Sequence, residues 1–267
     1  MKLLIDVLKP MMHSSKLTRV GAQSDGGYVL PALLFSGEPL NLVTFGVGYE
    51  FSFEKDLLSR EKNSNILMYD YSCGLFGTIE RLVTAVKSLK FLSALKIVIN
   101  YLRWKIFHIM NVKSIRFIPK YISREENAQA ISFQEMMVDW GEFKNDGRSI
   151  LKIDIERDEY NLLTVDIIKN ITDNFDVLVM ELHGVEDYYS EIKSMHDYFA
   201  ESGYFVCHLH HNNYTHYIPS EKLTNCFEIS YCSERLQSSE ALASNEFPKE
   251  GLDYPCNSKI KDVSWNV

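Results

Sequence analysis

The most regular feature of the chain is a series of seven short apolar runs. Each run has four or five residues, and the apolar positions in most of them are continuous rather than alternating with polar ones. Continuous runs of this length indicate strands that are buried on both faces of a sheet. The runs are Asn41–Phe45, Ile66–Tyr69, Ser114–Ile118, Ile150–Ile153, Val177–Met180, Tyr204–His208 and Phe227–Tyr231.

Amphipathic segments lie between most of these runs. They are Phe53–Arg60, Phe133–Asp139, Glu159–Asn170 and Glu186–Ala200. Strands that alternate with helices predict βαβ units and a mostly parallel sheet. We therefore predict an α/β fold of the Rossmann-like, class I methyltransferase type, with a seven-stranded sheet and a single domain over residues 1–267. The polar tail after Tyr231 is expected to be irregular.

One segment interrupts this alternation. Thr78–Met110 is long, apolar and basic, and its spacing predicts one or two amphipathic helices inserted at about residues 74–112. These helices are expected to pack on the core or on a second subunit, which would make a homodimer. A lid over the site and a helix on a membrane surface are the alternatives. No run of about 20 uncharged apolar residues exists, so we expect no stable membrane insertion.

Composition and net charge limit the kinds of molecule that the protein is expected to bind. The chain has 267 residues and a net charge of −8, whereas nucleic-acid binders usually carry a basic stripe. We therefore expect a small-molecule substrate and no nucleic acid. The five cysteines form no C-x-x-C pair, which favours reduced thiols in the cytoplasm. The N-terminal residues 1–12 do not resemble a signal peptide.

A glycine turn and an acidic residue indicate a nucleoside site. Gly46 and Gly48 follow the first run, and Asp70 ends the second, 24 positions after Gly46. Glycines at the end of a strand let the backbone approach a ligand, and a carboxylate there can bind ribose hydroxyls. A loop or helix-cap role is the alternative for Asp70. Phe51 stands where a dinucleotide site needs a third glycine, so the pattern favours S-adenosylmethionine over NAD.

Acidic and imidazole side chains follow the later strands, on the same predicted rim. We expect the catalytic residues among Asp154, Glu181, His183 and His208. In one hypothesis, His183 or His208 removes the proton of an acceptor hydroxyl, oriented by Asp154 or Glu181. In the other, Asp154, Glu181 and His210 bind Mg²⁺ or Mn²⁺. Glu156 and Glu159 are expected to cap the next helix.

These residues together resemble the FkbM-type methyltransferases and their methyltransferase-like relatives. The resemblance spans roughly residues 18–232 without the inserted helices. It is carried by Asp25–Leu30 (DGGYVL), Thr44–Gly48 (TFGVG), Phe53-Glu54, Tyr69-Asp70, Leu151–Glu156 (LKIDIE) and Glu181–Gly184 (ELHG). Arg157 replaces the glycine that usually follows the fifth of these motifs, so the turn there is expected to differ.

The resemblance implies an S-adenosylmethionine-dependent O-methyltransferase. Its acceptor would be a hydroxyl of a sugar or nucleotide sugar, used in capsule or other surface polysaccharide synthesis. The residues implied to bind the cofactor or border it are Asp25, Gly27, Tyr28, Phe45, Gly46, Val47, Gly48, Glu50, Asp70, Tyr71 and Asp154.

Rival functions remain open at this stage. A metal-dependent hydrolase would use the same Asp, Glu and His rim, but would not need Gly46, Gly48 and Asp70. A nucleotide-sugar enzyme that uses nicotinamide would need a third glycine in the turn, and this sequence lacks it. A binding module without catalysis would use the basic insertion to dock on a partner or a membrane.

Overall fold

A seven-stranded sheet forms the centre of the molecule. The computed structural model describes residues 3–124, 126–236 and 246–266. The strands are β3 (Leu40–Phe45), β4 (Asn65–Tyr69), β5 (Ile115–Ile118), β8 (Arg148–Ile153), β9 (Val177–His183), β10 (Tyr204–His211) and β13 (Cys226–Ser233). They match the seven predicted runs, six of them extended by one to three residues and β5 shortened by one, and the α/β prediction is confirmed.

The strand order is that of a doubly wound fold. It runs β10-β13-β9-β8-β3-β4-β5, and β13 is antiparallel to both its neighbours while the other strands are parallel. Counted along the chain, this is the order 3-2-1-4-5-6 with a seventh strand placed between the last two. The order reverses between β3 and β8. Ligands of such sheets bind beyond the carboxyl ends of the strands at this point.

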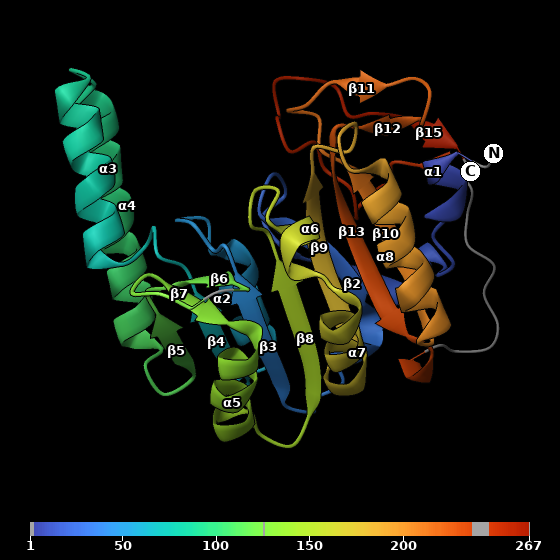
Figure 1. Ribbon diagram of the computed structural model, residues 1–267, viewed down its shortest axis with the longest axis horizontal. Coiled ribbons are helices and arrows are strands. Elements are labelled where there is room, and N and C mark those ends of the chain that lie inside the picture. Colours follow the sequence, from blue (N-terminus) through green and yellow to red (C-terminus); the bar gives the residue numbers. More distant parts are fainter. Residues whose placement is uncertain (1–2, 125, 237–245, 267) are drawn as a thin grey trace.

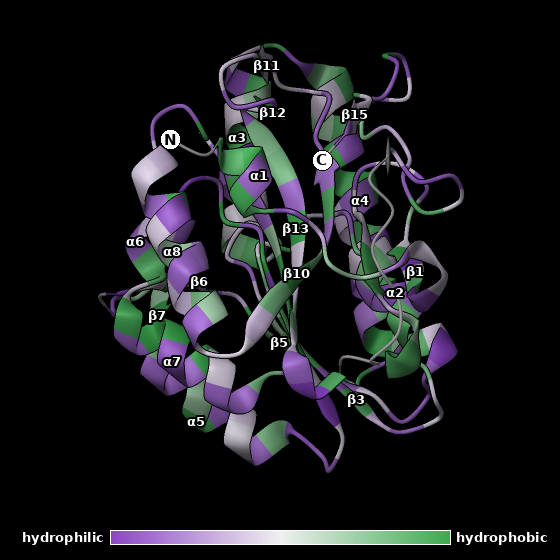
Figure 2. Cartoon of the chain, turned by 90° about the vertical axis from the view of Figure 1, so that its right-hand side faces the viewer, coloured by the Kyte–Doolittle hydropathy of each residue, from purple (hydrophilic) through white to green (hydrophobic). Residues whose placement is uncertain are grey.

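Helices cover one face of the sheet. They are α1 (Leu4–Val7), α5 (Phe133–Phe143), α6 (Glu159–Leu162), α7 (Val165–Asn174) and α8 (Tyr189–Glu201), and Figure 2 shows α5 to α8 on one side of the sheet. Glu159–Asn170 was predicted as one helix, but it is interrupted after Leu162. Thr164 is extended there, and its side chain caps α7 by accepting from the backbone N–H of Ile167.

The opposite face is covered by α2 (Ser52–Arg60), by the base of α4 and by a hairpin of β1 (Leu17–Gly21) and β2 (Gly27–Pro31). Two 3₁₀ turns, Ser14–Lys16 and Ala32–Leu34, flank this hairpin. The apolar runs of the sequence did not reveal it. Its burial places Val20, Tyr28 and Leu30 in the second half of the core.

The inserted segment forms two antiparallel helices, α3 (Leu75–Lys87) and α4 (Phe91–Met110). Figure 1 shows them extending away from the sheet beside β5. Among the helices that the structure describes, none has the length and apolar character needed to cross a membrane.

The tail after β13 is more ordered than expected. Besides η3 (Glu234–Leu236), the short strands β14 (Glu246–Phe247) and β15 (Trp265–Asn266) pair with each other. Phe247, Cys256 and Trp265 are buried, and two of them join the core cluster, while residues 248–264 between the two strands form no helix or strand and are irregular as expected. Two further two-stranded sheets join β6 (Tyr121–Ser123) to β7 (Ala130–Ser132) and β11 (Tyr217–Ile218) to β12 (Leu223–Thr224). All five cysteines are free and buried.

Candidate functional site

A polar cavity of about 460 Å³ opens at the carboxyl ends of β3, β4, β8 and β9. This is the edge where the strand order reverses. The cavity gathers ten of the predicted site residues, which are Asp25, Tyr28, Gly46, Val47, Gly48, Glu50, Asp70, Asp154, Glu181 and His183. It also includes Gly26, Tyr49, Ser72, Lys152, Glu156, Asn212, Tyr214, Thr215 and Cys226.

The glycine turn after β3 needs its two glycines for different reasons. Gly46 has a φ of +74°, and a Cβ there would lie 1.6 Å from the backbone oxygen of Asp154. Gly48 has a φ of +58°, but a Cβ there would meet only the backbone nitrogen of Glu50, at 3.9 Å. Gly46 therefore lets β3 and β8 approach each other, while Gly48 leaves the wall of the cavity open.

The carboxylate of Asp70 is attached to this turn. The backbone N–H of Gly48 donates to its Oδ2 at 2.6 Å, and the N–H of Cys73 donates to its Oδ1 at 3.2 Å. The two elements meet because β3 and β4 are parallel and paired up to Phe45 and Tyr69. Each carboxylate oxygen keeps a further acceptor site, so Asp70 can still bind two hydroxyl groups of a ligand.

Asp154 lies beside the buried ammonium group of Lys152. Lys152 is 3% exposed, and its Nζ lies 3.9 Å from Oδ2 of Asp154 and 5.1 Å from the ring centre of Tyr28. Burial lowers the pKa of Lys152, but the charges of Glu54 and Asp154 outweigh that effect and raise it. Burial raises the pKa of Asp154 to about 6, against the opposing charge of Lys152. A buried lysine inside an apolar strand is the sequence signal that could have revealed this pair.

Glu181 and His183 project from the end of β9. Oε1 of Glu181 accepts from Nδ2 of Asn212 at 2.7 Å and lies 3.1 Å from the thiol of Cys226. Burial, reinforced by the charge of Asp154, raises the pKa of Glu181 to about 8. Cys226, which begins β13, and Asn212, which follows β10, were not predicted as site residues.

The imidazole of His183 is oriented by Glu159. Its Nδ1 lies 2.9 Å from Oε1 of Glu159, whose side chain is fully buried. Burial alone would lower the pKa of His183, but the hydrogen bond to Glu159 and the charge of Glu181 raise it to about 9. Glu159 lies in the first turn of α6, but its side chain does not cap that helix: it accepts from the N–H of Ile155 and contacts His183.

The free Nε2 of His183 faces carboxylates. It lies 3.7 Å from Glu156 and 3.8 Å from Glu181. Ligand atoms of Asp154, Glu156 and His183 all lie within 4.8 Å of one another, as do those of Glu181, His183 and Cys226. A histidine whose other nitrogen is held by a carboxylate is typical of metal ligands, so these residues fit a divalent cation.

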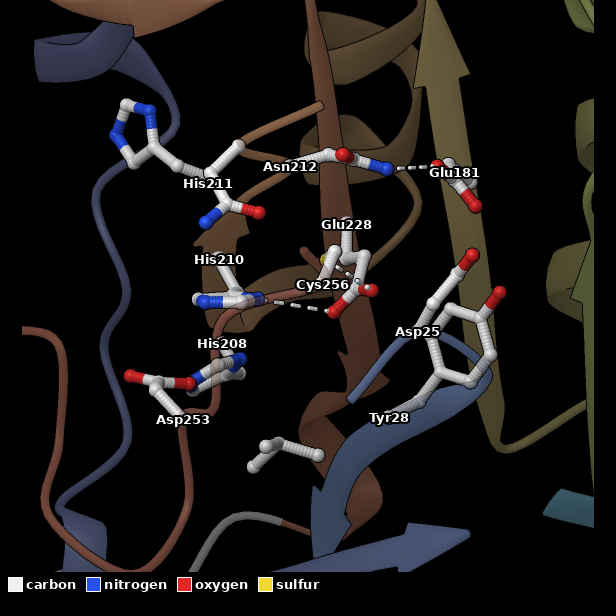
Figure 3. A network of polar contacts seen from close by, with 12 residues as sticks. Asp25, Tyr28, Glu181, His208, His210, His211, Asn212, Glu228, Asp253 and Cys256 are labelled. Atoms are coloured by element: carbon white, nitrogen blue, oxygen red, sulfur yellow. Dashed lines mark hydrogen bonds and ion pairs between the residues drawn. The ribbon is translucent and has the colours of Figure 1, made fainter. Parts of the chain in front are cut away.

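His208 and His210 lie outside this cavity, which corrects their predicted roles. Nε2 of His208 is 2.9 Å from Asp253, and His210 contacts Glu228 at 3.2 Å and Asp262 at 3.0 Å. Figure 3 shows His208 beside Asp253 and His210 beside Glu228, with Glu181 on the other side of the view. The C-terminal segment covers this part of β10, so the imidazoles are buried with carboxylate partners. The predicted metal set of Asp154, Glu181 and His210 is therefore not brought together: Asp154 and Glu181 lie in two different groups with His183, and His210 lies in a third with Glu228 and Cys256.

The remaining predicted residues surround the cavity without lining it. Phe45 is fully buried in the core, and the hydroxyl of Tyr71 donates to Glu80 at 2.9 Å. Gly27 begins β2, where a Cβ would lie 2.0 Å from the backbone oxygen of Ala22. The preceding loop brings Asp25 to the cavity because Arg19 holds it, donating to Ala22 and Ser24 at 2.6 and 2.7 Å.

The turn at Arg157 keeps a glycine-like conformation. Arg157 has a φ of +85° and Glu156 a φ of +56°, a region that side chains other than glycine rarely adopt. Arg157 thus stands in a conformation that glycine adopts readily, and a difference between this turn and the glycine-containing one stays a prediction. The guanidinium of Arg157 lies 3.1 Å from Asp187. Strained residues of this kind cluster at functional sites.

A second cavity, of about 480 Å³, adjoins the first and shares Gly48, Tyr49 and Glu50 with it. Lys55, Arg81 and Arg103 line it from α2, α3 and α4. None of the three forms an ion pair with a carboxylate in the described ranges, and Arg81 packs 5.0 Å from the ring centre of Tyr49. An anionic group of a ligand is the natural partner of such a cavity.

No family model and no curated protein match the chain. Several solved structures are similar to it. Precorrin-6Y C5,15-methyltransferase from Geobacter metallireducens GS-15 is 11% identical over 76% of this chain and 85% of its own, with a TM-score of 0.36. The Methanococcus jannaschii fibrillarin pre-rRNA processing protein is 8% identical over 73% and 66%, with a TM-score of 0.38.

Aeropyrum pernix fibrillarin, in complex with natively bound S-adenosyl-L-methionine, is 9% identical over 73% of this chain and 66% of its own, with a TM-score of 0.35. Similarities of this size support no statement about the reaction.

Proposed function

We propose that the protein is an S-adenosylmethionine-dependent methyltransferase that acts on a hydroxyl of a sugar or nucleotide sugar. The proposal depends on one observation: the Gly46–Gly48 turn and the Asp70 carboxylate are joined at the reversal point of the sheet and line one cavity. That arrangement suits an adenosine, with its ribose hydroxyls on Asp70 and a backbone turn against it.

The residues present fit this cofactor better than a dinucleotide. Gly48 leaves open space where a side chain would stand. Phe51 occupies the place of the third glycine that a pyrophosphate site requires. When bound, the cofactor supplies an activated methyl group. Gly46, Gly48 and Asp70 would hold it, and the protein's other task is to align and deprotonate the acceptor.

Asp154 is the best general base in the cavity. Its pKa of about 6 leaves it ionised at neutral pH and close to the value that favours proton transfer. His183, with a pKa of about 9, is mainly protonated there. We therefore assign proton removal to Asp154, and we assign to His183 and Glu181 the positioning of the acceptor.

A bound cation is the alternative way to activate the hydroxyl. Asp154, Glu156 and His183 would hold Mg²⁺ or Mn²⁺, which would lower the pKa of a hydroxyl that joins it. Methyl transfer measured after exhaustive chelation separates the two mechanisms. Full activity without metal supports Asp154 as the base, and activity that is lost and then restored by Mg²⁺ supports the cation.

The second cavity supports an acceptor that carries a phosphate. Lys55, Arg81 and Arg103 lie next to the proposed methyl-transfer site, as the phosphates of a nucleotide sugar would require. Together with the resemblance to FkbM-type enzymes, this favours an acceptor used in surface polysaccharide synthesis. The five buried thiols suit a reducing compartment such as the cytoplasm.

Thermal shift with S-adenosylhomocysteine and with NAD tests the cofactor, because a ligand that binds the folded state raises the melting temperature. We expect a rise with S-adenosylhomocysteine alone. Methyl incorporation into a panel of nucleotide sugars then tests the acceptor. A rise with NAD only, or hydrolysis of the panel without a methyl donor, would contradict the proposal and favour a rival enzyme class.

A further inference from the structure

Exposed apolar side chains gather on the α3–α4 hairpin. In the described part of the chain, 24 large hydrophobic side chains are exposed, and 16 of them fall between Leu75 and Val112. Leu89, Phe91 and Leu92 at the turn between the helices are 75%, 65% and 79% exposed. Folded proteins rarely leave an apolar surface of this extent without a partner. We call these 16 side chains the hairpin surface.

The same segment is basic, with six lysines and arginines and one acidic residue, Glu80, between Leu75 and Val112. From Arg81 to Arg124 the sequence has ten lysines and arginines and no aspartate or glutamate, in a chain whose net charge is −8. Lys87, Lys90 and Lys96 form no ion pair with any carboxylate that the structure describes. A hairpin that is both apolar and positively charged matches the surface of an anionic bilayer.

The hairpin is fixed to the body only at its base. Trp104 and Phe107 are buried there, and the ring of Phe107 stacks on Phe51 at 4.7 Å. The turn between α3 and α4 lies at the opposite end, away from the sheet (Figure 1). The apolar tip is therefore presented outward by a rigid base.

We propose that the hairpin surface docks on a bilayer that contains anionic lipids and lies in its headgroup region without crossing it. Neither helix could span a bilayer. A second copy of the chain fits less well, because two hairpins packed together would bring like charges into contact. This proposal is independent of the methyltransferase activity.

Co-sedimentation of the full chain with vesicles tests the proposal. We expect binding to vesicles of equal parts phosphatidylcholine and phosphatidylserine, weaker binding at high salt, and little binding to phosphatidylcholine alone. The substitutions Lys87→Gln, Lys90→Gln and Lys96→Gln together should weaken binding by about fivefold for each charge removed. The control, Lys62→Gln with Lys144→Gln and Lys169→Gln, removes three exposed charges elsewhere and should bind like the wild type.

A second test examines the apolar tip. Leu89→Glu with Leu92→Glu should abolish vesicle binding, whereas Val138→Glu, at a side chain 65% exposed on α5, should not. All native cysteines are buried, so Leu92→Cys can carry an environment-sensitive dye, whose emission should shift to the blue on anionic vesicles. The matched Val138→Cys label should not shift.

Three results would overturn the proposal. They are no binding to anionic vesicles, binding that the tip and lysine variants leave unchanged, and a dimer that Leu89→Glu with Leu92→Glu dissociates while vesicles are ignored. The last result, seen by sedimentation velocity, would assign the hairpin surface to a second copy. Thermal melts of each variant, with and without S-adenosylhomocysteine, separate these outcomes from misfolding and from failure of the proposed activity.

Discussion

The backbone N–H of Gly48 donates to Oδ2 of Asp70 at 2.6 Å, so the turn after one strand and the acid after the next form one unit. Asp70→Asn keeps an oxygen for this hydrogen bond but removes the charge. If Asp70 holds ribose hydroxyls, the Kd for S-adenosylhomocysteine rises by about 10- to 100-fold. Isothermal titration calorimetry measures it, with the exposed Asp146→Asn as control. An unchanged Kd in D70N would contradict the assignment of Asp70 to a nucleoside site.

Three glycine-to-alanine substitutions separate packing from backbone strain. Gly46→Ala should destabilise the fold by about 3 kcal/mol or more, because its Cβ would overlap the backbone oxygen of Asp154. Gly37→Ala, with a φ of +87° and open space around it, should cost about 1 kcal/mol.

Gly48→Ala should also cost about 1 kcal/mol, yet it should weaken S-adenosylhomocysteine binding because the new methyl group points into open space at the cavity. Urea unfolding and calorimetry measure the two effects. Equal stability losses in G46A and G37A would refute the packing role assigned to Gly46.

Arg157 stands in a backbone conformation that favours glycine. Arg157→Gly and Arg157→Ala both remove the exposed ion pair with Asp187, which contributes little. Only the glycine variant relieves the strain, so we expect R157G to be more stable than R157A by about 1 kcal/mol. Chemical denaturation compares them, and equal stabilities would mean that the turn relaxes in solution.

The assignment of Asp154 as general base predicts a pH profile. Since its pKa is about 6, kcat should fall as the pH drops below that value and Asp154 becomes protonated. Asp154→Asn should lower kcat by about 10²- to 10⁴-fold and remove the acidic limb from what remains. A limb that survives in D154N would point to another base.

The stability of the unliganded protein should decrease as the pH rises through neutrality. Glu181 holds its proton up to about pH 8 in the folded state, whereas an ordinary glutamate loses it near 4.5. Its contribution is therefore complete below the unfolded pKa and is lost as the pH rises through the folded one. The raised pKa of His183, about 9, acts in the same direction from 6.5 upward.

Glu181→Gln tests this, because glutamine resembles the protonated acid and still accepts from Asn212. Near pH 5 the variant and the wild type should have similar free energies of unfolding. At pH 8.5 the variant should be more stable by about 2 kcal/mol. Parallel profiles for the two proteins would show that Glu181 is ionised in the fold.

The sequence predicted the sheet well because every strand except β5 is almost entirely buried on both faces. Continuous apolar runs such as Val177–Met180 need no tertiary information to be recognised. The β1–β2 hairpin escaped because the glycines at its turn and Arg19 within it break the apolar pattern. Its position depends on Arg19 donating to backbone oxygens, one of them Leu252, 233 positions away.

Site residues that directly follow central strands were predicted correctly. Contacts with residues from distant parts of the chain were missed. Gly46, Asp70 and Asp154 meet because parallel strands end at one edge. His208 ended its predicted run, but β10 continues to His211 and the C-terminal segment covers the His208 side chain, which no local pattern could indicate. Glu159 was predicted to cap a helix because only the local sequence was visible. Its contact with His183 is made by the tertiary fold and cannot be predicted from neighbouring residues.

The buried imidazoles of β10 obtain their counter-charges from residues far along the chain. His208 pairs with Asp253, and His210 pairs with Asp262, 52 positions later. Until both acids are in place, this strand carries polar groups that cannot be sealed from water. Sealing these polar groups from water therefore requires the C-terminal segment to dock on β10.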